Sequence, residues 1–311
     1  MQKFKVLALC LVMSLFAMMA LGSGSSSSGA DKEISSVGST DSSNSNTADT
    51  EATVEVENTT QSTEAGVTVD ETVLLEQDGI KITATGMDDG LFGTELKLLI
   101  ENDSSTNLTF QARNASVNDY MVDTMMSEDV AAGKKSNTSL TFSTSGLKDC
   151  GIDTIANMEF SFHIFTTDDW DDFLDSDIIS LDTSAAGSYT QNYDDSGEVF
   201  YDKDGIKIIG KGLSSNDSFF GPGLIVYIEN NSSKNFTVQV RDTSVNGFMI
   251  DTSMSEDVIV GKKAITAVTF FSSSLEENGI TDITSIETSF HVFDMESWDT
   301  IVDTDPITIN F

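Results

Sequence analysis

The chain is organised around residues 116–124, which read Ser-Val-Asn-Asp-Tyr-Met-Val-Asp-Thr, and their copy at residues 244–252, which read Ser-Val-Asn-Gly-Phe-Met-Ile-Asp-Thr. The offset between the two is 244 − 116 = 128 residues. The same offset relates Phe162-His163 to Phe290-His291 and Trp170 to Trp298. Self-similarity at a fixed period predicts one structural unit that is made twice.

Each copy has the pattern of a β-sandwich. Short apolar runs alternate with turn signals, such as Asp78-Gly79 and Asn246-Gly247, and the second of these is typical of a two-residue hairpin. About eight short strands in roughly 115 residues, without a long helical period, favour a sandwich. We therefore predict an all-β chain with two tandem immunoglobulin-like β-sandwich domains, at residues 71–184 and 198–311, joined by a linker at 185–197.

Residues 1–22 are predicted to be an export signal. Lys3 and Lys5 precede an apolar run that ends in the small residues of a cleavage site, with the cut expected before Ser23. A run of about 16 apolar residues is short for a membrane-spanning helix. Membrane attachment through an uncleaved segment is the alternative. We expect an extracellular or cell-envelope protein.

Residues 23–70 are rich in Ser, Thr, Asp, Glu and Gly, and they are predicted to form a disordered stalk because they offer little apolar surface to bury. The whole chain has 51 acidic and 16 basic residues, a formal charge of −35. Nucleic acid is excluded as a partner, since its phosphates are met by clustered lysine and arginine.

Two matching segments resemble a known family. Residues 228–238 read Ile-Glu-Asn-Asn-Ser-Ser-Lys-Asn-Phe-Thr-Val, and residues 100–109 read Ile-Glu-Asn-Asp-Ser-Ser-Thr-Asn-Leu-Thr. This order of strand, Glu-Asn, turn and strand resembles immunoglobulin-like domains in secreted proteins and lipoproteins of Gram-positive, Clostridium-like bacteria. The resemblance implies the fold and a surface location. Members are largely of unknown function, so it supplies no site residues, and Ser23 stands where a lipoprotein would carry its cysteine.

No metal site is assigned from the sequence. Residues 202–205 (Asp-Lys-Asp-Gly) begin like a calcium loop, and residues 168–177 are dense in aspartate. Calcium prefers such hard oxygen ligands, but the first segment lacks the glutamate that closes a twelve-residue loop. A hairpin turn explains Asp-Gly equally well. No cofactor is predicted, and calcium stays an alternative.

No catalytic site is predicted either. His163 and His291 occupy matching positions and are expected on the outer side of their strands, because their neighbours alternate inward. Cys150 is matched by Asn278 in the second copy and has no nucleophile motif beside it. The Gly-Lys-Lys turns do not have the context of a phosphate loop, so their lysines are expected to pair with nearby acids.

The tip of the organising hairpin supplies the predicted partner-binding residues. Large aromatic and methionine side chains are common at interfaces, although here they could instead plug the end of the sandwich. Trp170 and Trp298 are predicted to be core lids over the last strand rather than platforms for sugar stacking. The candidate partner-binding residues are Tyr120, Met121, Met126, Phe248, Met249 and Met254.

These observations predict a non-enzymatic extracellular or cell-envelope module for binding, adhesion or spacing. Its partner would be a protein or glycan at the cell surface, and two copies of a weak site would raise the apparent affinity. One alternative is a calcium-dependent envelope sensor, which uses the acidic loops. The other is a hydrolase whose site the sequence does not reveal.

Overall fold

A computed structural model describes residues 66–214 and 220–311. The predicted export signal and nearly all of the predicted stalk lie outside these residues. Residues 62–311 form one compact unit. None of the helices in the described part of the chain is long and apolar enough to cross a membrane.

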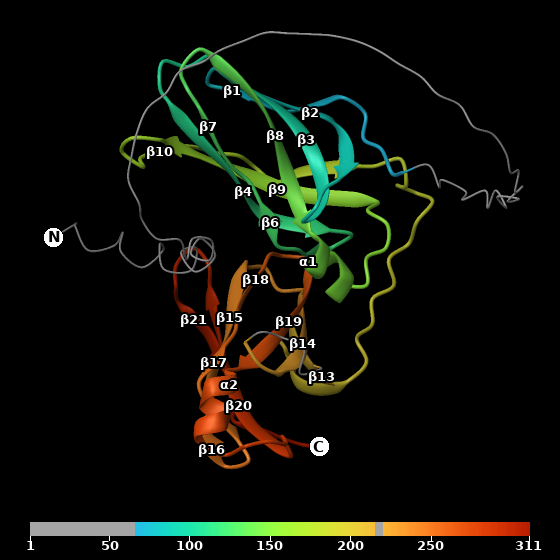
Figure 1. Cartoon of the computed structure of the whole chain (residues 1–311), viewed down its shortest axis with the longest axis vertical. Helices are drawn as coiled ribbons and strands as arrows, with labels where there is room; N and C mark the ends of the chain where they lie inside the picture. Colours follow the sequence, from blue (N-terminus) through green and yellow to red (C-terminus); the bar gives the residue numbers. More distant parts are fainter. Residues whose placement is uncertain (1–65, 215–219) are drawn as a thin grey trace, which may run out of the picture. The chain divides into compact units, whose positions relative to one another are not determined.

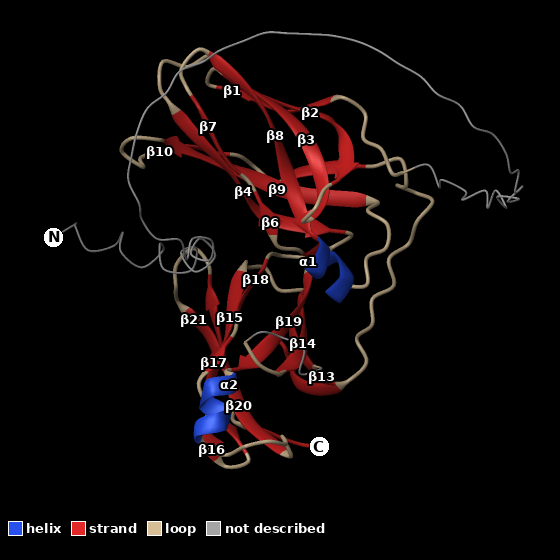
Figure 2. Cartoon of the chain, in the orientation of Figure 1, coloured by secondary structure: helices blue, strands red, loops and turns tan. Residues whose placement is uncertain are grey.

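The described part of the chain is all-β, as predicted: strands make up 57% of it and helix 5% (Figure 2). The N-terminal half is defined here by its elements, β1 (Thr72–Gln77), β2 (Ile80–Asp89), β3 (Gly93–Asn102), β4 (Leu108–Val117), β5 (Tyr120–Met121), β6 (Thr124–Met125), β7 (Ser127–Val130), β8 (Lys134–Ser143), α1 (Thr144–Asp149), β9 (Asn157–Thr166), β10 (Asp172–Asp175) and β11 (Ile179–Asp182).

The C-terminal half has the same order of elements. They are β12 (Glu198–Lys203), β13 (Ile206–Leu213), β14 (Gly223–Asn230), β15 (Phe236–Val245), β16 (Phe248–Met249), β17 (Thr252–Ser253), β18 (Ser255–Val258), β19 (Lys263–Phe270), α2 (Ser272–Glu277), β20 (Ser285–Asp294), β21 (Thr300–Asp303) and β22 (Ile307–Asn310).

Two layers of strands form each half (Figure 1). In the N-terminal half one layer runs β1-β2-β3-β8-β6, and the other runs β10-β9-β4-β5 with β7 paired to β4 and β11 to β9. In the C-terminal half the layers are β12-β13-β14-β19 with β17, and β16-β15-β20-β21 with β18 and β22. A parallel pairing of β5 with β19 joins β10-β9-β4-β5 and β19-β14-β13-β12 into one 11-stranded sheet. This arrangement is sandwich-like, and the domain boundaries read from the sequence stay predictions.

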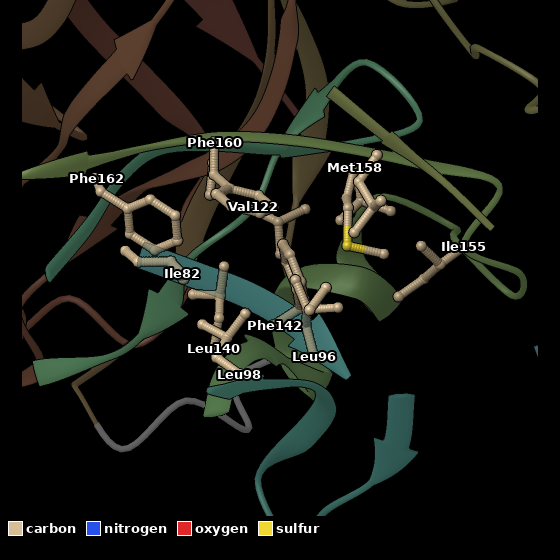
Figure 3. Close-up of a cluster of buried hydrophobic side chains, with 14 of the residues drawn as sticks. Ile82, Leu96, Leu98, Val122, Leu140, Phe142, Ile155, Met158, Phe160 and Phe162 are labelled. Atoms are coloured by element: carbon tan, nitrogen blue, oxygen red, sulfur yellow. The ribbon is translucent and has the colours of Figure 1, made fainter. Parts of the chain in front are cut away.

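Alternating side chains fill the space between the layers. In β3, Leu96, Leu98 and Ile100 are at most 1% exposed, because every second residue of a strand faces the same side. Figure 3 shows Leu98 with Phe142 of β8 and, from the opposite layer, Phe160 of β9. The C-terminal half has a second core of its own.

The predicted two-residue turns are present. Asn118 and Asp119 have φ angles of 47° and 65°, and Asn246 and Gly247 have 51° and 83°. Positive φ at both central residues defines the hairpin turn whose twist matches the flanking strands. The sequence therefore predicted this local geometry correctly in both copies.

Asn102, the last residue of β3, is fully buried and joins the two layers of the N-terminal half. Its Nδ2 donates to the carbonyl oxygens of Thr106 and Val130, each at 2.9 Å. Its Oδ1 accepts from the backbone nitrogen of Ser104 at 3.1 Å and from the hydroxyl at 2.6 Å. Because β3 and β7 belong to different layers, this one side chain holds the layers together at the corner.

Asn230 repeats the arrangement in the C-terminal half. Its Nδ2 donates to the carbonyls of Lys234 and Val258, at 2.9 and 2.7 Å. Its Oδ1 accepts from the nitrogen and hydroxyl of Ser232, at 3.0 and 2.7 Å. The repeated Glu-Asn segment thus has a structural role, which is to bond a buried corner.

Lys262 lies where the two halves of the compact unit meet. Its side chain is 8% exposed, and its Nζ is 2.7 Å from Asp119 Oδ1 and 2.8 Å from Glu159 Oε2. Next to it, Tyr120 of β5 pairs with Lys263 of β19. Lys135 likewise forms an ion pair with Glu101. Lys262 and Lys135 thus bind acids, as the sequence predicts, whereas Lys263 Nζ lies 4.2 Å from the centroid of the Tyr193 ring.

We expect the Asn102→Ala variant to lose about 2 to 3 kcal/mol of unfolding free energy, because the carbonyl of Val130 and the amide of Ser104 stay buried without their partner. Asn137→Ala, on an exposed position of β8, is the control and should change stability by about 0.5 kcal/mol or less. Denaturant titration measures both. Equal losses in the two variants would contradict this role.

Lys262→Ala should cost about 2 kcal/mol, since it leaves two carboxylates without their buried cation. Lys134 occupies the matching position 128 residues earlier and is exposed. Lys134→Ala is therefore the matched control, and we expect its effect to be about 0.5 kcal/mol or less. Thermal or denaturant unfolding of the full chain compares them, and a larger loss in Lys134→Ala would be the contrary result.

Candidate functional site

The predicted partner-binding residues divide into two groups. Tyr120 is 2% exposed and Met254 is 8% exposed, so neither offers surface to a partner. Tyr120 is covered because it packs into a core cluster with Ile209 and Tyr227 of the C-terminal half. Met121 and Met126 are partly buried and pack against the two cores.

Phe248 and Met249 are the exposed group. They are 49% and 65% exposed at the tip of β16. They match Tyr120 and Met121 by the offset of 128, yet they lack the packing that covers that pair. Of the six predicted residues, these two are the exposed ones.

Trp170 and Trp298 are not lids over a core, which corrects the prediction made for them. Their side chains are 71% and 65% exposed. Both residues have φ near 60°, at 61° and 63°. That backbone region is rarely adopted by a bulky residue and costs free energy. The turn that holds this conformation projects each indole outward, so the ring lies on the surface.

Each indole stacks on a phenylalanine of the preceding strand. The ring centroids of Trp170 and Phe165 are 5.3 Å apart at an interplanar angle of 17°, and those of Trp298 and Phe293 are 5.6 Å apart at 16°. One face of the indole therefore rests on the protein. With the tryptophan so exposed, the opposite face is available to a ligand.

A histidine and an aspartate complete the cluster. His163 packs 5.2 Å from Phe165 between ring centroids, and its Nδ1 lies 2.6 Å from Asp175 Oδ1. His291 packs 5.3 Å from Phe293, and its Nδ1 lies 2.5 Å from Asp303 Oδ1. His291 is partly exposed, but His163 is only 8% exposed, which corrects the prediction of a solvent-facing position, because Phe165 and Asp175 cover its ring. The exposed aspartates hold the ring orientation.

We define the first aromatic platform as Trp170, Phe165, His163 and Asp175, and the second as Trp298, Phe293, His291 and Asp303. In each case the tryptophan precedes a short outer strand, β10 or β21, by two residues. The backbone nitrogen of Trp170 donates to the Thr166 carbonyl at 3.0 Å, and that of Trp298 to the Asp294 carbonyl at 2.9 Å. The two platforms are thus built alike.

Exposed carboxylates surround the first platform. Asp168, Asp169, Asp171 and Asp172 flank the tryptophan in sequence and are all exposed. The second platform has Glu296 and Asp299 exposed beside it. Its Asp294 is instead bonded to Lys234 at 2.6 Å, and this ammonium together with two backbone amides lowers the pKa of Asp294 to about 2. The first platform is therefore the more strongly acidic.

The acidic segments show no metal site. Among residues 66–214 and 220–311, no group of three or more His, Cys, Asp or Glu side chains is placed to hold a metal ion. Asp202 and Lys203 end β12, and Asp204-Gly205 form the turn to β13, with φ angles of 55° and 79°. A hairpin thus accounts for the Asp-Gly pair.

A cavity of about 330 Å³ is lined by Asp123, Cys150, Glu256 and Thr266, among others. Burial raises the pKa of the Cys150 thiol to about 12, so the reactive thiolate is scarce at neutral pH. Burial also raises the pKa of Glu256 to about 8, and the carboxylate of Asp123 adds to this rise. No sequence pattern points to the Glu256–Asp123 pair, because the two residues are far apart along the chain.

The raised pKa of Glu256 makes stability depend on pH. The folded chain holds the proton of Glu256 more tightly than the unfolded chain does. The contribution of this carboxyl to the free energy of unfolding therefore falls as pH rises from 4.5 toward about 8. We expect Glu256→Gln to flatten the loss of stability between about pH 5 and about pH 8. Glu128→Gln, at the matching position 128 residues earlier, is the control that removes a carboxyl outside the cavity.

Denaturant titrations of wild type and both variants at the two pH values provide the measurement. An unchanged slope in Glu256→Gln would show that this carboxyl does not carry the effect.

Comparison with known proteins adds little. No family model matches the chain, and no curated protein matches it. Among solved structures, the YadV chaperone shares 10% identity with it, with 75% of this chain and 100% of that chain covered, at a TM-score of 0.23. Similarity this low supports no conclusion about fold or function.

Proposed function

We propose that this chain is a non-enzymatic extracellular binding module, made of two tandem immunoglobulin-like sandwiches behind an export signal and a stalk. Its binding surfaces are the two aromatic platforms. The single observation that carries the proposal is the recurrence, in both halves, of an exposed tryptophan in a strained backbone conformation, stacked on a phenylalanine beside a His–Asp pair.

Exposing these rings costs the folded chain free energy, so a contribution to stability does not explain why they are exposed. An indole with 71% of its surface in water loses most of the benefit of burial. A left-handed backbone conformation at a bulky residue costs about 1 to 3 kcal/mol more. Features that disfavour the free protein in both halves are expected where a ligand uses them, because aromatic rings provide large contact area at low entropic cost.

Duplication supports a binding role over a catalytic one. The platforms contain a histidine and carboxylates, but neither contains a nucleophile bonded to the histidine. Each histidine uses Nδ1 for its aspartate, which orients the ring. Two similar sites on one chain suit a repetitive or bivalent ligand, since the second contact forms at a high effective concentration.

The immunoglobulin-like assignment within this proposal is supported by the repeated strand order and by the matched corner asparagines, Asn102 and Asn230. The resemblance to domains of secreted Gram-positive proteins, carried by the same Glu-Asn segments, agrees with it. The cell-surface location follows from the apolar segment at residues 1–22.

Binding to a panel of immobilised neutral, amino-substituted and acidic polysaccharides, and of basic and acidic proteins, tests the proposal with the full chain. For any member that binds, we expect Trp170→Ala or Trp298→Ala alone to weaken attachment by about tenfold to a hundredfold, because avidity is lost. The double variant should abolish it.

A second double variant, Phe248→Ala with Met249→Ala, separates the platforms from the exposed hairpin tip. We expect it to bind as well as wild type. If the variant without both tryptophans still binds and the variant without Phe248 and Met249 does not, the hairpin tip is the recognition surface instead. Absence of binding to every member would contradict the proposal.

A further inference from the structure

We infer that the ligand of the two platforms is an extended, lysine-bearing segment of a partner protein, which adds to the edge strands β10 and β21 and lays lysine side chains over Trp170 and Trp298. This inference rests on the proposed function and narrows it to one ligand class. Three observations carry it: the open indole face, the surrounding charge and the unpaired strand edges.

The open face of each indole suits a cation. Aromatic rings attract ammonium and guanidinium groups placed over their faces, and tryptophan does so most strongly. Phe165 and Phe293 occupy one face of each ring and keep it oriented. The chain already contains one such contact, in which Lys263 Nζ lies 4.2 Å from the centroid of the Tyr193 ring.

The charge around the first platform favours a positive ligand and disfavours a negative one. Asp168, Asp169, Asp171 and Asp172 are exposed next to Trp170. Arg113 is close enough to feel the carboxylates of Asp172 and Asp175, but it supplies a single positive charge. These carboxylates would repel an anionic ligand. A lysine side chain could contact the face of the indole and form ion pairs with the carboxylates.

Unpaired strand edges favour a peptide over a sugar. Within residues 66–214 and 220–311, β10 pairs with β9 alone, and β21 pairs with β20 alone. Each is a four-residue strand with one register shift, and its outer side carries backbone amide and carbonyl groups that no strand of these ranges pairs. Figure 1 shows β10 at the rim of its layer. Such an edge is the template on which an extended peptide adds a strand.

Each tryptophan lies just before an edge strand in the sequence. Trp170 is followed by Asp171 and then β10, and Trp298 by Asp299 and then β21. Each indole stacks on a phenylalanine of the neighbouring strand, β9 or β20, so a lysine of a peptide paired to the outer edge has to extend across β10 or β21 to reach it. Alternate side chains of a strand point to the same face, so every second residue of the ligand can reach the platform.

Intrinsic fluorescence of the full chain provides the test, because the sequence has only two tryptophans, one in each platform. The probes are a short peptide in which lysine alternates with threonine, the same peptide with glutamine for lysine, and the lysine peptide methylated on alternate backbone nitrogens. An oligomer of glucosamine supplies amino groups without a peptide backbone. Titrations run in Trp170→Phe and Trp298→Phe variants assign the signal to each platform.

We expect the lysine peptide to change the emission of both tryptophans until binding saturates. Its affinity should fall as salt is added, because salt screens the charges. The glutamine peptide should bind at least about tenfold more weakly, and so should the methylated peptide, because it cannot donate to the strand edge. Replacing Asp168, Asp169 and Asp171 by asparagine should weaken the lysine peptide at Trp170 and leave its binding at Trp298 unchanged.

Three results would overturn the inference. Equal binding of the lysine and glutamine peptides would show that recognition does not depend on the positive charge of the ligand. Equal binding of the lysine peptide and its methylated form would show that the ligand does not add as a strand. Binding of the glucosamine oligomer without the peptide would point to an amino-sugar ligand. In this last case, and wherever platform-dependent binding to another polymer is found, the proposed function stands. Failure of every probe and every panel member would overturn both.

Discussion

The structure depends first on the buried amide of Asn102 and its counterpart Asn230. Each of these side chains makes four hydrogen bonds and connects a strand of one layer to the last carbonyl of a strand in the other layer. In a sandwich the apolar core is not directional, so it presses the layers together without setting their register. A fully bonded buried amide is directional, and it specifies the corner at which β3 turns into β4.

That corner has consequences at the opposite edge of the sheet. The turn holds β4, and eight residues of β4 pair with β9. In β9, Phe162 and Ile164 point into the main core, and the alternating residues His163 and Phe165 point away from it. The turn after β9 projects Trp170 over Phe165 and starts β10. The same chain of constraints leads from Asn230 through β15 and β20 to Trp298. The platforms recur because the whole order of strands and turns recurs in the second half.

The sequence predicted the all-β class and the paired turns, because these depend on local spacing and on the period of two. It did not predict the exposure of the tryptophans, since an isolated Trp favours burial and only the positive φ of the turn projects it outward. It also treated Tyr120 and Phe248 alike. Their burial differs because Tyr120 packs beside Ile209 and Tyr227, a tertiary contact that no local pattern reveals. The Glu256–Asp123 proximity was missed for the same reason.

We propose that two equivalent aromatic platforms, one in each half, form the recognition surface. The number of lysine-peptide molecules bound per chain, measured by isothermal titration calorimetry, tests this proposal. We expect two in the wild type, one in Trp170→Ala or Trp298→Ala, and none when both are replaced. A stoichiometry of one that neither single substitution changes, or of two that persists in the double variant, would contradict it.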